Sequence, residues 1–167
     1  MKKFALAALA AIAVFGASSV QAASDTQTFT VTVAPTLTIT APANASMAHN
    51  TTNANQVFPN QDWAVTCNNA AGADVSFQIT TFANGAVERD ASLAVSVTSA
   101  NQLSAGWVVS NSPQTTAGTG TTATVLADSV GPGNATFTLG VSFLDTDYAV
   151  LPAGDYIATV TGTITAK

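Results

Sequence analysis

The chain has 167 residues, of which 47% are hydrophobic and only 8% are charged, against roughly 25% in an ordinary globular domain. Nine acidic residues against four basic ones give a formal net charge of −5. Nucleic acids and anionic membranes require a footprint of lysine and arginine that this chain lacks. The composition therefore argues against either of them as a partner.

Residues 1–22 have the pattern of an export signal. Lys2 and Lys3 form a positive start, an uninterrupted apolar run covers 4–15, and small residues suited to cleavage end at Ala22. The apolar run is too short to cross about 30 Å of hydrocarbon, so a membrane anchor is disfavoured. The sequence predicts a protein exported through the periplasm to the cell surface or the medium, without insertion into a membrane.

Short alternating segments follow along the mature chain, separated by clusters of Gly, Pro, Asn and Asp. Alternation of apolar and polar residues is typical of strands with one buried face. The pattern predicts strands at 28–33, 36–41, 62–68, 74–82, 92–98, 106–110, 122–127, 135–143 and 155–166. Asn84-Gly85 predicts a tight hairpin turn, whereas the polar composition of residues 43–60 predicts a long surface loop.

These elements predict the fold class. Many short strands with turn signals between them, and no convincing helix of about ten residues or more, indicate an all-β, two-sheet antiparallel sandwich. We expect one domain at residues 36–167. Residues 23–35 are either an N-terminal extension or the first strand, because Pro35 separates two alternating segments whose apolar residues stay in phase.

The mature chain offers little chemistry for catalysis. It has one cysteine, Cys67, one histidine, His49, and one glutamate, Glu88. Acid–base pairs, nucleophile–base pairs and histidine metal sites need more ionisable groups than this. We therefore expect no enzyme activity and no cofactor. Cys67 shares a strand face with Trp63 and Val65, so we expect a buried, unpaired thiol.

Two further groups of residues are candidates for binding. Trp63 and Trp107 would stack on a sugar ring if exposed, but both fall in apolar strand patterns, and we expect them in the core. Asp145 and Asp147, followed by Asp155, carry oxygens suited to Ca²⁺. A calcium shell needs about six to eight oxygens, so Asp145 and Asp147 are weak candidates. Capping of turns is the favoured interpretation of these carboxylates.

The two ends of the mature chain resemble subunits of bacterial fimbriae. Residues 151–167 resemble the last strand of chaperone–usher pilins, in which a glycine, here Gly154, opens an alternating strand. The aromatic residue that this family has next to its C-terminus is replaced by Ala166. Residues 29–39, two alternating segments around Pro35, resemble the start of disulfide-free subunits of the colonisation-factor type.

The resemblance implies an immunoglobulin-like sandwich that lacks one strand and is completed by the N-terminal strand of the next subunit. It implies that Phe29, Val31 and Val33 enter a groove on that neighbour. The expected groove is bordered by the C-terminal strand with Gly154, Tyr156, Ala158, Val160, Gly162 and Ile164. The implied partners are copies of the chain in a head-to-tail fibre, with a periplasmic chaperone and an outer-membrane usher during assembly.

Two other functions are compatible with the same pattern. The chain could be a self-complete secreted binding module, for carbohydrate or for surface adhesion, whose first strand pairs within its own chain. It could also be a subunit of a biofilm or surface-layer matrix fibre that forms without a chaperone. A first strand that pairs within its own chain therefore predicts a binding module, whereas one that pairs with another copy predicts a fibre subunit.

Overall fold

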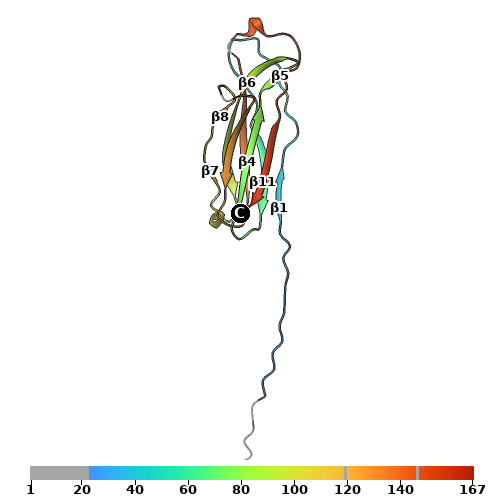
Figure 1. Ribbon diagram of the computed structural model, residues 1–167, viewed down its shortest axis with the longest axis vertical. Coiled ribbons are helices and arrows are strands. Elements are labelled where there is room, and N and C mark those ends of the chain that lie inside the picture. Colours follow the sequence, from blue (N-terminus) through green and yellow to red (C-terminus); the bar gives the residue numbers. More distant parts are fainter. Residues whose placement is uncertain (1–22, 119, 146) are drawn as a thin grey trace, which may run out of the picture. The chain divides into compact units, whose positions relative to one another are not determined.

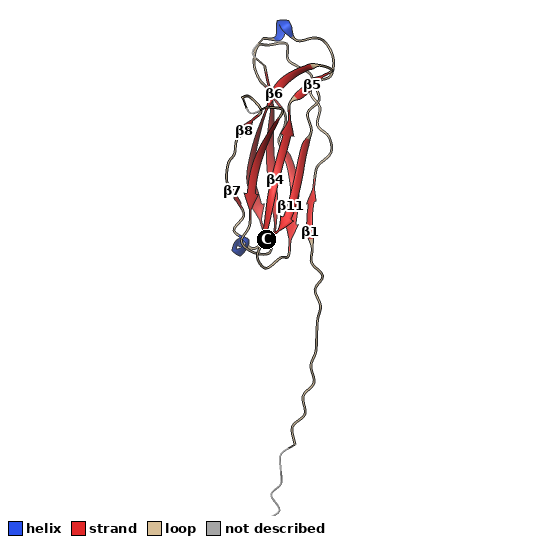
Figure 2. Cartoon of the chain, in the orientation of Figure 1, coloured by secondary structure: helices blue, strands red, loops and turns tan. Residues whose placement is uncertain are grey.

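The structure is a computed structural model that describes residues 23–167 apart from residues 119 and 146. It is nearly all β, with two one-turn 3-10 helices among the described residues (Figure 2). The strands form two antiparallel sheets, which confirms the coarser part of the predicted fold class, an all-β protein with two antiparallel sheets. The chain divides into two units, and the boundary lies between Val33 and Ala34.

In the first unit, the described residues 23–33 form no strand. The side chains of Phe29, Val31 and Val33 are 83%, 88% and 77% exposed. The prediction of a strand at 28–33 is therefore wrong for this structure. Alternation alone does not make a strand, because the backbone groups also need a neighbouring strand to bond with.

The described residues of the second unit form eleven strands. In chain order these are β1 (Leu37–Thr40), β2 (Gln56–Val57), β3 (Gln61–Cys67), β4 (Ala73–Thr80), β5 (Phe82–Asn84), β6 (Val87–Ala100), β7 (Val108–Val109), β8 (Gln114–Thr115), β9 (Thr122–Asp128), β10 (Gly133–Leu144) and β11 (Val160–Ala166). The 3-10 helices are η1 (Leu103–Ala105) and η2 (Tyr148–Val150). The two-residue strands β2 and β8 were not predicted, and β11 begins at Val160 rather than at Asp155.

The larger of the two sheets has seven strands and the smaller one has four. The larger sheet has the order β1-β3-β10-β6-β5, with β2 added to β10 and β8 added to β6. The smaller sheet has the order β11-β4-β9-β7. β10 is the centre of the larger sheet, where Phe137 pairs with Trp63 on one side and with Val97 on the other.

The inward residues of both sheets form one hydrophobic core. Trp63, Val65 and Cys67 share the inner face of β3, and Cys67 is a free, buried thiol as expected. Trp107 is also buried and packs edge-on against Phe137, with ring centroids 5.6 Å apart. The expectation that both tryptophans belong to the core is confirmed.

β1 and β11 are edge strands of different sheets and lie side by side (Figure 1). Gly162 in β11 allows this approach, because a Cβ there would lie 2.6 Å from Cζ3 of Trp63 and 2.7 Å from Cδ1 of Ile39. The two edges therefore close over the core at the level of Ile39.

Candidate functional site

An open groove of about 820 Å³ lies beside the two strand edges. Residues 41–47, which follow β1, form its first wall, and residues 151–160, which lead into β11, form its second wall. Its volume lies within the range of about 300–1,000 Å³ that is usual for ligand sites. The groove lies entirely within the second unit of the chain.

The floor of the groove is apolar and largely aromatic. Phe58 stacks on Phe82, with ring centroids 5.8 Å apart, and Phe82 meets Phe143 edge-on at 5.3 Å. Phe143 in turn contacts Tyr156 at 5.5 Å, and Ile79 adds an aliphatic side chain from β4. An apolar occupant is favoured here, because each Å² of apolar surface removed from water contributes about 25 cal/mol.

The groove also carries little charge. Asp155 is the one carboxylate among its described lining residues, its side chain is exposed, and no lysine or arginine lies among them. An anionic occupant would therefore find no lysine or arginine, and a cationic one would find only the exposed Asp155. The chemistry of the groove matches an uncharged, apolar segment.

The second wall, residues 151–160, leads into β11 and is paired only at isolated points before that strand begins. Ile157 exchanges both backbone hydrogen bonds with Ala83, each 3.0 Å long. Successive residues of an antiparallel strand direct their backbone groups to opposite edges, so Tyr156 and Ala158 direct theirs away from β5 and toward the groove. Neither backbone is hydrogen-bonded to any residue that the structure describes.

The first wall continues the alternation of β1. Asn68 N–H donates to Thr36 O at 3.1 Å. The backbone groups of the even-numbered residues of β1 therefore pair with β3, and those of the odd-numbered residues point away from β3. The odd-numbered Leu37 and Ile39 also pack against the core. In the first wall, the odd-numbered residues that follow are Ala41, Ala43, Ala45 and Met47. No hydrogen bond joins residues 41–47 to the rest of the described chain.

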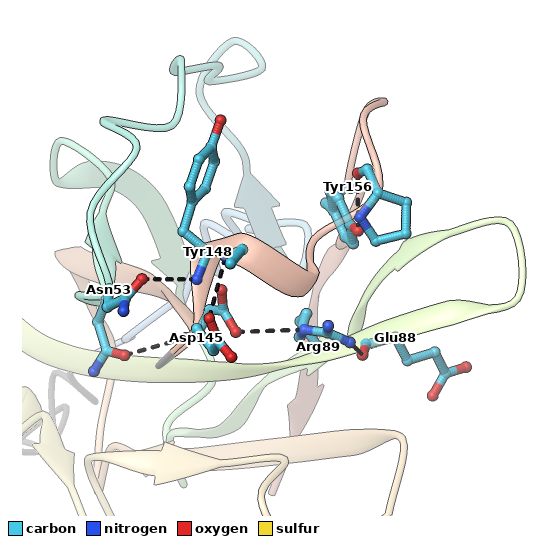
Figure 3. A network of polar contacts seen from close by, with 10 residues as sticks. Asn53, Glu88, Arg89, Asp145, Tyr148 and Tyr156 are labelled. Carbon is cyan, nitrogen blue, oxygen red and sulfur yellow. Dashed lines mark hydrogen bonds and ion pairs between the residues drawn. The ribbon is translucent and has the colours of Figure 1, made fainter.

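His49 and Tyr148 line the groove where it meets the loop around η2. Their rings stack with centroids 5.0 Å apart and an interplanar angle of 19°. Figure 3 shows how the backbone of Tyr148 is held: its N–H donates to the side-chain oxygen of Asn53 at 2.9 Å. Thr51 N–H donates to Nδ1 of His49 at 3.0 Å, which fixes the His49 ring.

The weak calcium candidates, Asp145 and Asp147, are both engaged within the chain. Oδ1 of Asp145 lies 3.5 Å from Nε of Arg89 (Figure 3), and the Asp145 N–H donates to the Asn55 side chain at 3.2 Å. Asp147 accepts a hydrogen bond from Ala149 N–H at 3.2 Å and so caps η2. The described residues hold no group of three or more His, Cys, Asp or Glu side chains suited to a metal ion.

The hairpin between β5 and β6 supports the second wall. Asn84 pairs with Val87 and Gly85 has φ +60, so the predicted hairpin is confirmed, with Gly85 and Ala86 as its loop residues. Asn84 Nδ2 donates to Ala153 O at 3.4 Å. Gly154 has φ +142, and a Cβ there would lie 2.6 Å from the same nitrogen. Glycine is therefore required where the wall meets the hairpin.

The predicted interface residues fall into three groups. Four of them line the groove: Gly154, Tyr156, Ala158 and Val160. Two lie further along β11, outside the groove lining: Gly162 and Ile164. Three are exposed in the first unit: Phe29, Val31 and Val33. Sequence reasoning missed the first wall, residues 41–47; the signal that identifies it is the odd-numbered phase that continues from β1.

Comparison of the chain with models of known families, with curated proteins and with solved structures gives no match. No helix in the described part of the chain is long and apolar enough to span a membrane. The function is therefore argued from the residues and the geometry of the groove.

Proposed function

We propose that the protein is a structural subunit of a cell-surface filament, a fimbria or an extracellular matrix fibre, that assembles by strand donation. Residues 23–33 of one copy occupy the groove of the next. One observation carries this proposal: two walls with unpaired backbone groups stand on either side of an apolar floor. An inserted strand bonds to both walls and covers the floor, which makes the sandwich a complete immunoglobulin-like fold.

The donor segment fits the groove in chemistry. Phe29, Val31 and Val33 alternate with threonines, carry no charge and are exposed. Burial of three such side chains contributes on the order of 5–8 kcal/mol. Association itself costs about 4–15 kcal/mol in lost freedom, so these side chains alone do not suffice. Backbone pairing along both walls supplies the rest and sets the register.

The connectivity of the chain favours a groove on another copy. The Thr36 N–H is bonded to the side-chain oxygen of Asn68, at the start of β1, whereas the groove begins beyond the end of β1. If the segment turned at Pro35 and ran back along β1, Val31 would come level with Ile39. The position beside Ile39 is already occupied by Gly162 of β11. Only residues before Val31 would reach the groove in this way.

Donation from copy to copy has a defined outcome. Each copy has one donor segment and one groove, so the contact is head-to-tail and does not close on itself, which generates a fibre. Filling the groove also removes an exposed edge that would otherwise recruit other strands. Export through the periplasm, with a chaperone and an usher, belongs to the same proposal and rests on the resemblance of the two ends to fimbrial subunits.

Electron microscopy of the purified mature chain tests this function. We expect filaments from the wild-type chain and none from Val31→Asp, because a carboxylate cannot be buried cheaply in an apolar groove. The matched control is Thr32→Asp, in the opposite phase of the same segment, which should retain filaments. A wild-type chain that stays monomeric at high concentration would contradict the proposal and favour the self-complete binding module.

A further inference from the structure

We infer that the alanines of the first wall, Ala41, Ala43 and Ala45, set the size of the side chains that the groove accepts. Their small side chains keep the groove open for a donor strand that carries bulky apolar residues. Larger residues in their place would fill the groove from within the same chain. This inference rests on the proposed function, in which the donor is residues 23–33 of a second copy.

The alanines occupy the phase in which the neighbouring strands place large residues. Leu37 and Ile39, earlier in the same phase, pack against the core. The inward positions of β4 include Phe77 and Ile79, both fully buried. Residues 41–47 form no strand and are all exposed, so neither strand preference nor burial accounts for the three alanines. Size is the property that these three residues share.

The consequence for packing is an open surface groove of the size that ligand sites have. Here about 820 Å³ stays open beside the alanines and above an apolar floor. The opposite wall adds a further small residue, Ala158. Bulky side chains from another chain are therefore the complement that the groove lacks.

The test uses the mature chain with Val31→Asp, which retains its groove but carries a disabled donor segment. Ala43→Ile is introduced into this chain to fill the groove. The matched control is Ala64→Ile, the same change at an exposed position of β3 that does not line the groove. Ala45→Val provides a second, milder filling should Ala43→Ile fail to fold. The probe is a fluorescent peptide of residues 23–33, and the melting temperature of each chain is measured without peptide.

We expect Ala43→Ile to bind the peptide at least 10-fold more weakly than its parent and to melt a few degrees higher, while Ala64→Ile binds like the parent. Equal binding by Ala43→Ile and its parent overturns the inference and leaves the proposed function intact. If the parent itself does not bind the peptide, the proposed function fails. The inference then fails with it, because it concerns the donor strand that the groove accepts. A higher melting temperature of Ala43→Ile alone would show only that the added side chain fills the groove.

A size exchange tests the same inference from the donor side. Three peptides are compared on the Ala43→Ile groove, each shortened at one position: Phe29→Ala, Val31→Ala or Val33→Ala. If the alanines set the accepted size, one of these peptides binds the filled groove more tightly than the unshortened peptide does. If all three bind it more weakly, the alanines do not set the size of the donor.

Discussion

Gly162 determines how closely the two sheet edges approach each other. Its missing side chain makes room for the Trp63 ring and for Ile39, which would otherwise lie 2.6 Å and 2.7 Å from a Cβ. The two edges therefore meet at this residue and separate beyond it. The absence of a side chain at Gly162 thus helps to determine where the groove ends.

We predict that Gly162→Ala destabilises the protein by about 1–3 kcal/mol, because the added methyl group overpacks a filled site. The control is Gly140→Ala, where the nearest atom to a Cβ, Oδ1 of Asn60, lies at an ordinary distance of 3.5 Å. The control should stay within about 0.5 kcal/mol of the wild type. Urea denaturation measures both, and equal midpoints for the two variants would contradict the prediction.

Single residues were predictable from the sequence where their neighbours along the strand determine their environment. Trp63 and Cys67 were placed in the core by alternation alone, and both are buried. The role of Gly162 was not predictable, because the atoms that a Cβ would meet belong to Ile39 and Trp63, far away in the sequence. Such a contact follows from topology, which alternation does not determine.

At the scale of elements, the end of β11 is held by Lys167, the residue that follows this strand. Lys167 Nζ lies 2.8 Å from Oδ2 of Asp128 and 3.5 Å from Oδ1 of Asp74, which belong to the two neighbouring strands of the smaller sheet. Asn69 Nδ2 also donates to Lys167 O at 2.9 Å. These contacts join β11, β4 and β9 at the end of the sheet opposite to the groove walls.

The hydrogen bond to Asp128 raises the pKa of Lys167 above its ordinary value of 10.5, and the charges of Asp128 and Asp74 act in the same direction. A pKa raised by folding means that the protonated form favours the folded state, so the contribution is complete below pH 10.5 and is lost as the pH rises through the folded pKa. We therefore expect the wild type to melt above Lys167→Met at about pH 9, and the difference to vanish toward pH 12. A difference that stays constant over this range would contradict the prediction.

The strands that were predicted correctly are those in which several apolar residues alternate with polar ones. β3, β4, β9 and β10 lie where the alternation placed them, because each has a full inward face of large apolar residues. β2 and β8 have two residues each, too few to show a period. β11 begins late because residues 154–159 pair at isolated points only, Ile157 with Ala83 of β5 and Thr159 with Thr80 of β4. That interrupted pairing is what leaves the second groove wall free.

At the scale of the molecule, the function we propose depends on the backbone groups of the two groove walls that the sandwich leaves unpaired. The sequence predicted the fold class and a donor segment, but it did not show the strand order, in which β3 pairs with β10 and β4 with β11. Strand order brings the ends of the second unit together as edges of two different sheets. The groove exists because residues 41–47 and 151–160 separate there, and no local pattern encodes that separation.

Mixing two complementary variants tests strand donation between copies most directly. The mature chain with Val31→Asp has a groove but no working donor segment. The mature chain with Ala158→Glu keeps its donor segment, but a charge in its groove would be buried under any docked strand. Each variant alone should sediment as a monomer in analytical ultracentrifugation. Their equimolar mixture should form a one-to-one dimer and nothing larger, whereas monomers in the mixture, or polymers of either variant alone, would contradict the account.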